Sequence, residues 1–368
     1  MAVIDKHQTN PVRIHNFVPA CVTMPPSSRI PPLLQPYAEL PREESLTLVT
    51  STLGASANWL LIRFLCAALG TATARGGGEE DHNVVLVSWM RPYEFWKQES
   101  RKSAALDLER LRKEGRFAFV DGLGAGSDAT SDARQASAAP SNGIHAQRGL
   151  QTLSARGPPG RIVPARGPPA SPQATTTTAE TTGASSNTSG HYTLKSLELD
   201  DVKATISSAV SALTTAPVQR KTLLIFDNPD LLLALNPSIT PSRFTSLVLT
   251  LQTIPTVSHI LTHIQSDNPL LSLSAPPQPL ELAHHNLLVK CAHMSRRILG
   301  VRILDTGVAR DVSGVIRITE QKHEWLDLGF GDNEPKEGGD SGRGKEFLYQ
   351  VKGDGSVRVF ERGAGGEG

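Results

Sequence analysis

The run NVVLVS from Asn83 to Ser88 constrains the fold most, because it is almost uninterruptedly apolar. Strands covered on both faces, as in a parallel sheet, have this composition, whereas a strand with one face in water alternates. A second apolar run, Thr222 to Asp227, ends in an acidic residue. From Trp96 to Leu111, buried-type residues recur at spacings of three or four, which is typical of a helix with one buried face. The chain therefore alternates between strands and helices.

The same alternation extends along most of the chain. We expect strands at 45–51, 83–88, 117–121, 222–227 and 257–264, with helices near 59–69, 92–111, 199–213, 243–252 and 280–294. The runs 297–304 and 314–319 alternate as antiparallel neighbours do, and 347–351 and 357–360 flank a Gly-Asp-Gly turn that predicts a hairpin. The predicted fold is α/β: a mainly parallel sheet with helices on both faces and an antiparallel C-terminal edge.

Two segments lack the apolar residues that a core requires. Residues 1–40 are rich in proline and show no period of 2 or 3.6, which predicts a disordered tail. Residues 122–190 consist mainly of Ala, Gly, Ser, Thr and Pro, which predicts a disordered insertion. We therefore expect one domain formed by residues 41–121 and 191–362.

Charge and cysteine usage narrow the function classes. Lys and Arg total 37 against 36 Asp and Glu, so the net charge of +1 implies no strongly acidic partner. Cys21, Cys66 and Cys291 are far apart and share no metal-ligand spacing, which favours buried thiols in a reducing compartment. No signal-peptide pattern is present at the N-terminus. We expect a cytoplasmic protein without membrane contact, with the nucleus as a second location.

The loop after the first predicted strand is where an α/β sheet of this kind would bind phosphates. A phosphate-binding loop needs a Gly-Lys pair followed by Ser or Thr, yet no Lys occurs between Arg42 and Met90. Three residues keep the character of a degenerate nucleotide site: Thr52, Gly54 and Ser56. These residues suit anion binding at a helix N-terminus, but helix capping alone explains them and is the favoured interpretation. We predict that the chain lacks a functional phosphate-binding loop.

Asp227 occupies the strand-end position where NTPases of this architecture hold magnesium. Asp230 follows closely, and Asn228 and Pro229 between them favour a structural turn instead. We therefore predict no catalytic residue, no cofactor and no metal, with Asp227 as a degenerate site position.

Other residues that could carry chemistry have simpler explanations. His259 and His263 have the spacing of helical zinc ligands, but their segment is predicted to be a strand. A basic group could form a solvated face, a subunit interface or an RNA-facing patch, and comprises Arg296, Arg297, Arg302 and Arg310.

Three segments resemble a known family when taken together. They are VVLVSWMRPYEFWKQESRKSAALDLERLRKEGRFAFVDGL up to Leu123, KTLLIFDNPDLLLAL from Lys221, and the C-terminal VRVFERG. Over about residues 41–123 and 191–362, the chain resembles the fungal Elongator complex protein 6 family.

The resemblance implies a RecA-like fold and a non-catalytic role. Members of the family form a hetero-hexameric ring with the fourth and fifth Elongator proteins, and the ring binds transfer RNA. The ring attaches to the larger Elongator subcomplex, which modifies wobble uridines. The family also lacks the Lys of the first loop, and the resemblance carries over no catalytic residue.

Two alternatives remain open at the sequence level. The first is a divergent RecA-like NTPase that uses Asp227 for magnesium and an arginine in place of the missing Lys. The second is a free-standing RNA-binding protein that uses the arginines of the insertion.

Overall fold

The computed structural model describes residues 30–70, 82–124, 190–214, 219–271, 274–307, 309, 311–321 and 344–361. Residues 1–29 of the predicted tail, residues 125–189 of the predicted insertion, Cys21 and Arg310 lie outside the described residues. Among the described residues, no helix is long and apolar enough to cross a membrane. Cys66 and Cys291 are buried, as predicted.

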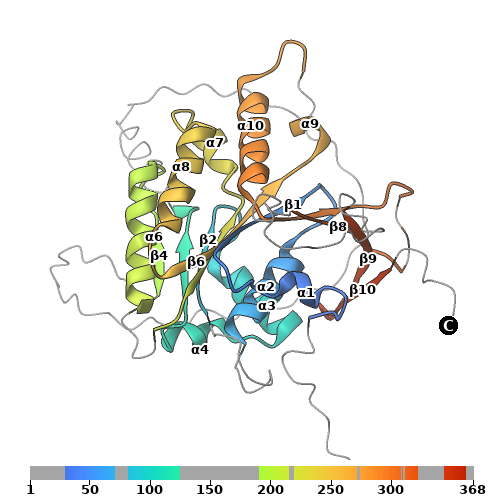
Figure 1. The fold of residues 1–368 in the computed structure, drawn as a ribbon, viewed down its shortest axis with the longest axis horizontal. Coiled ribbons are helices and arrows are strands. Elements are labelled where there is room, and N and C mark those ends of the chain that lie inside the picture. The colour runs from blue at the N-terminus through green and yellow to red at the C-terminus, as the bar shows by residue number, and fades with distance from the viewer. Residues whose placement is uncertain are drawn as a thin grey trace, which may run out of the picture.

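The described residues contain one ten-stranded sheet in the order β10-β9-β8-β7-β1-β6-β5-β2-β3-β4 (Figure 1). Neighbours from β7 through β4 pair in parallel, while β7, β8, β9 and β10 pair antiparallel. The strands are β1 (Ser45–Ser51), β2 (Asn83–Ser88), β3 (Phe117–Asp121), β4 (His191–Thr193), β5 (Thr222–Asp227), β6 (Val257–Gln265), β7 (Arg297–Arg302), β8 (Gly314–Glu320), β9 (Lys345–Val351) and β10 (Val357–Glu361).

Helices cover both faces of this sheet (Figure 1). One face packs against α1 (Gln35–Ala38), α2 (Asn58–Leu69), α3 (Tyr93–Ala104) and α4 (Leu108–Lys113). The other packs against α6 (Leu199–Thr214), α7 (Leu231–Leu235), α8 (Pro241–Gln252) and α10 (Pro279–Met294), and α9 (Asn268–Leu271) contacts α10. The predicted α/β fold class, a mainly parallel sheet with helices on both faces and an antiparallel C-terminal edge, is confirmed.

The apolar runs that predicted central strands are buried on both sides. All six residues of β2 are buried, and so are all six of β5. Val84 and Leu86 pack in the core under α2 and α3, whereas Val85 and Val87 pack in the core under α6 and α8. Successive side chains of a strand point to opposite faces, so a strand between two helical layers needs apolar residues at every position.

The structure departs from the sequence-based expectation in three places. Residues 30–38 lie within the predicted tail, but Ile30 and Leu34 are buried in the core. A predicted helix over 92–111 is divided into α3 and α4 by Ala105, whose φ of 43° is left-handed. Strand β4 was not predicted, because three residues are too few for a detectable pattern.

The C-terminal hairpin is fixed to the helical layer through a buried arginine. Arg63 is 1% exposed in α2. Its guanidinium donates hydrogen bonds of 3.1 Å to the backbone carbonyl oxygens of Ser103 and Gly355, which lie in α3 and in the hairpin turn. Arg63 thus connects three parts of the chain that are far apart in sequence.

Candidate functional site

Four polar side chains meet at the carboxyl end of the central strands, on the face covered by α2. Ser88, Asp227 and His263 lie on one row across β2, β5 and β6, because Ser88 is paired with Asp227 and Asp227 with His263. Ser51 ends β1, the strand on the other side of β6. Carboxyl ends of parallel strands are where α/β sheets bind ligands, so this is the candidate site.

The four side chains form a continuous hydrogen-bonded chain. Ser88 Oγ donates to Asp227 Oδ2 over 2.7 Å, and His263 Nδ1 lies 3.0 Å from Asp227 Oδ1. His263 Nε2 lies 2.8 Å from Ser51 Oγ. A carboxylate can only accept, so Nδ1 donates to Asp227. Ser51 Oγ, which contacts Nε2, also donates to Gln265 Oε1 over 3.2 Å. The chain crosses four neighbouring strands.

This chain is sealed from water. Asp227 and Ser88 are fully buried, His263 is 1% exposed and Ser51 is 2% exposed. A Ser-His-Asp order is also found in hydrolases, but a nucleophile must reach its substrate. With Ser51 buried, the arrangement supports a structural role and no nucleophilic one.

A second histidine connects the same edge to α10. His284 Nε2 lies 2.8 Å from the carbonyl oxygen of Gln265, and its Nδ1 lies 3.9 Å from Asp230 Oδ2. Burial raises the pKa of the Asp230 carboxyl above its ordinary value. His284 is buried, because α10 turns that residue toward the strand ends.

The loop after β1 forms a tight turn in place of a phosphate cradle. The Ala55 amide donates to the Thr52 carbonyl over 2.9 Å, and Gly54 has a φ of +86°. The Thr52 amide donates to the Val301 carbonyl, and the Leu53 amide donates to the Asp267 carboxylate. A phosphate-binding loop needs its amides free and convergent, so these bonds leave a phosphate fewer donors.

Ser56 and Asp227 also have hydrogen-bond partners within the protein. Ser56 Oγ accepts a 3.3 Å hydrogen bond from the amide of Asn58 at the start of α2. The turn after β5 is made by Asn228, whose φ is 55°, and the carboxylate of Asp227 takes no part in it.

These residues do not fit a magnesium–nucleotide complex of the type that RecA-like NTPases bind. Such a site combines a Lys, free loop amides and an acid that faces the ion. Here the loop has no Lys, several of its amides are bonded within the protein, and both oxygens of Asp227 are hydrogen-bonded to neighbouring side chains.

His259 and His263 do not form a metal site together. Both lie on strand β6, and His259 bonds to Ser45 over 3.0 Å near the opposite end of the strand. Burial lowers the pKa of His259 to about 4. No group of three or more metal-ligating side chains occurs among the residues that the structure describes.

The predicted basic group is distributed among separate ion pairs. Arg296 pairs with Glu43 at 2.7 Å, Arg297 with Glu320 at 2.7 Å, and Arg302 with Asp305 at 2.6 Å. Arg297 also donates to the carbonyl oxygen of Tyr37. The described members are thus engaged within the chain, and exposed pairs of this kind contribute little stability.

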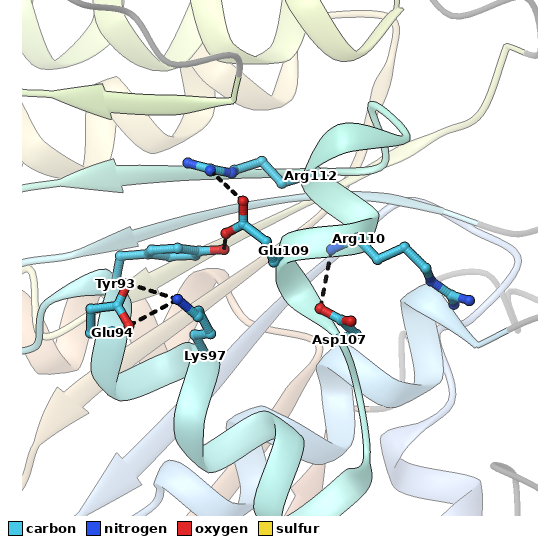
Figure 2. A network of polar contacts seen from close by, with 7 residues as sticks. All are labelled: Tyr93, Glu94, Lys97, Asp107, Glu109, Arg110 and Arg112. Carbon is cyan, nitrogen blue, oxygen red and sulfur yellow. Dashed lines mark hydrogen bonds and ion pairs between the residues drawn. The ribbon is translucent and has the colours of Figure 1, made fainter.

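A further polar network lies on α3 and α4 (Figure 2). The Tyr93 hydroxyl donates to Glu109 over 3.0 Å, and Arg112 donates to the other oxygen of Glu109 over 2.7 Å. The Arg112 hydrogen bond lowers the pKa of Glu109, whereas burial raises that of Tyr93. Asp107 caps α4 by accepting from the Arg110 amide. Because its charges are paired internally, this network fixes the α3–α4 corner.

No protein-family model and no curated protein matches the chain. Three solved structures are similar: an uncharacterized protein from Pyrococcus horikoshii in complex with an unknown peptide (10% identity, 91% of this chain, 99% of that chain, TM-score 0.49), a KaiC-like protein from Pyrococcus horikoshii OT3 (12%, 90%, 97%, 0.43), and flagellar accessory protein FlaH from Methanocaldococcus jannaschii (10%, 87%, 91%, 0.43). At these scores the similarities carry no argument about function, and the fold assignment stands on the sheet itself.

Proposed function

We propose that the chain is a non-catalytic subunit of the Elongator complex. In this proposal it forms a hetero-hexameric RecA-like ring with the fourth and fifth Elongator proteins. The ring supports modification of wobble uridines and binds transfer RNA as an assembly. In the same proposal, the ring attaches to the larger Elongator subcomplex. The chain is located in the cytoplasm, with the nucleus as a second location.

The state of Asp227 supports the non-catalytic part of this proposal most strongly. Its two carboxylate oxygens are hydrogen-bonded to Ser88 and His263, and the side chain is fully buried. An acid that holds magnesium must present an oxygen to the ion. The missing Lys and the internally bonded loop amides point the same way.

The Elongator assignment itself is supported by the three sequence segments given above. Two of them supply buried parts of the fold. The segment from Val84 to Leu123 forms β2, α3, α4 and β3, and the segment from Lys221 to Leu235 forms β5 and α7. Both segments therefore contribute buried strands and helix faces to the core.

Co-expression tests the assembly. The chain should co-purify with the fourth and fifth Elongator proteins as one particle with two copies of each, measured by native mass spectrometry. Expressed alone, it should self-associate or show low stability. A monodisperse monomer that ignores both partners would refute the assignment.

Nucleotide titration tests the divergent NTPase alternative. The isolated chain should show no saturable, magnesium-dependent ATP binding in isothermal titration calorimetry. Asp227→Asn is the matched control, because it removes the charge with little change in size. Micromolar binding that requires magnesium and is lost in this variant would establish the NTPase alternative.

A further inference from the structure

The four-strand polar chain contains the oxygen ligands of a divalent-cation site, with an imidazole among them. Oxygen atoms come from Ser51, Ser88 and Asp227, and Gln265 Oε1 lies 3.2 Å from Ser51 Oγ. Magnesium and manganese prefer carboxylate, carbonyl and hydroxyl oxygens in an octahedral arrangement. The side chains thus have suitable chemistry, but the space between Asp227 and Ser51 is not open to an ion.

His263 takes up that space. Its ring bridges Asp227, 3.0 Å from Nδ1, and Ser51, 2.8 Å from Nε2. Both ring nitrogens are therefore engaged, so the imidazole has no lone pair to offer a metal. The ring is also 1% exposed.

We propose that His263 excludes a divalent cation from this edge of the sheet, by holding the Asp227 carboxylate and by filling the space among the surrounding oxygen donors. The inference rests on the proposed non-catalytic function and names the residue responsible for it. The imidazole also takes over the structural task of a bound ion, since it connects the ends of β1, β5 and β6 without one.

Removal of the ring should create a cation site. In His263→Ala, Asp227 keeps one oxygen bonded to Ser88 and exposes the other to a space that the ring has left. Ser51 loses its ring partner and keeps its hydrogen bond to Gln265. A negatively charged, oxygen-lined space is expected to take up a divalent cation.

Cation uptake is measured by titrating the full-length chain with Mn²⁺ and monitoring the free ion by electron paramagnetic resonance. Wild type and Asp227→Asn should give the same isotherm. His263→Ala should bind one Mn²⁺ at least tenfold more tightly than wild type, and His263→Ala/Asp227→Asn should lose the gain. His259→Ala is the matched control: it removes a buried imidazole from the same strand, bonded to Ser45 and distant from Asp227, and should gain nothing.

The outcomes separate the inference from the function on which it rests. A folded His263→Ala that binds Mn²⁺ no better than wild type, or a gain that survives loss of Asp227, overturns the inference and leaves the non-catalytic function standing. An Asp227-dependent site in the wild type overturns both.

A measurement on the wild type covers the case in which His263→Ala does not fold. The Nδ1 proton of His263, observed by nuclear magnetic resonance in chain carrying ¹⁵N-labelled histidine, should keep its position and width when Mn²⁺ is added. Paramagnetic broadening of this proton would place the ion beside the ring and contradict the inference.

Discussion

Replacing Asp227 tests whether its carboxylate stabilises the fold or is held ready for an ion. Asp227→Ala removes the acceptor of two buried donors, the Nδ1 proton of His263 and the hydroxyl of Ser88. Neither donor can reach water, because both residues are at most 1% exposed. Both groups should therefore remain unpaired in the folded variant.

The size of the effect follows from those two groups. Leaving one buried donor unsatisfied costs about 1–3 kcal/mol, so Asp227→Ala should lower the free energy of unfolding by about 2–6 kcal/mol. Asp227→Asn keeps a carbonyl oxygen for one donor and should cost about 1–3 kcal/mol. A domain is typically stable by about 5–15 kcal/mol, so the first variant should lose a large share.

Urea unfolding followed by far-ultraviolet circular dichroism measures these changes, with the slope of the transition compared between variants. Asp200→Ala is the control, because Asp200 is exposed in the first turn of α6. It should change stability by less than about 0.5 kcal/mol.

The sign of the change decides between the two interpretations. Residues kept for binding commonly reduce stability, so removing a carboxylate that awaits an ion leaves a protein equally stable or more stable. If Asp227→Ala unfolds at the same urea concentration as wild type or a higher one, the structural role of this network is refuted.

Three further substitutions test other parts of the fold. The pKa of His259 is about 4 when folded and about 6.5 when unfolded, so protons favour the unfolded state. Stability should be complete above pH 6.5 and fall by up to about 3 kcal/mol as pH drops toward 4, and His259→Asn should remove that slope from pH-dependent urea unfolding. Arg63→Met should cost about 2–5 kcal/mol in the same assay, because two buried carbonyls lose their donor, whereas the exposed Arg101→Met should stay within about 0.5 kcal/mol. Gly54→Ala should lower the melting temperature through a cost of about 1–2 kcal/mol, since φ is +86° and the new Cβ would lie 3.3 Å from a neighbouring side chain. Gly353→Ala meets nothing within 4 Å and should leave the melting temperature unchanged.

Burial on both faces made the central strands predictable. Asn83–Ser88 and Thr222–Asp227 became β2 and β5 with the predicted bounds, because the inner positions of a strand between two helical layers are apolar on both faces. The break between α3 and α4 at the left-handed residue Ala105 could not be predicted from the sequence, because alanine is otherwise the best helix former.

The candidate site was only partly predictable. Asp227 was identified from its place at the end of an apolar strand, and the missing Lys follows from composition alone. His263 was considered only as a zinc ligand. A sequence signal for the hydrogen-bonded chain does exist. Ser51, Ser88 and Asp227 are polar residues at the ends of their strands, and His263 is a polar residue near the end of another strand.

The sequence by itself determined the order of most strands and helices and the absence of a Lys from the loop after β1, since local composition decides both. Only the tertiary structure decided that Asp227 is bonded to His263, 36 residues away, and His263 to Ser51, 212 residues away. The physical reason is strand register: it pairs Asp227 with His263 and places Ser51, which pairs with Gln265, two residues beyond the partner of His263. Register is set by packing of the whole sheet.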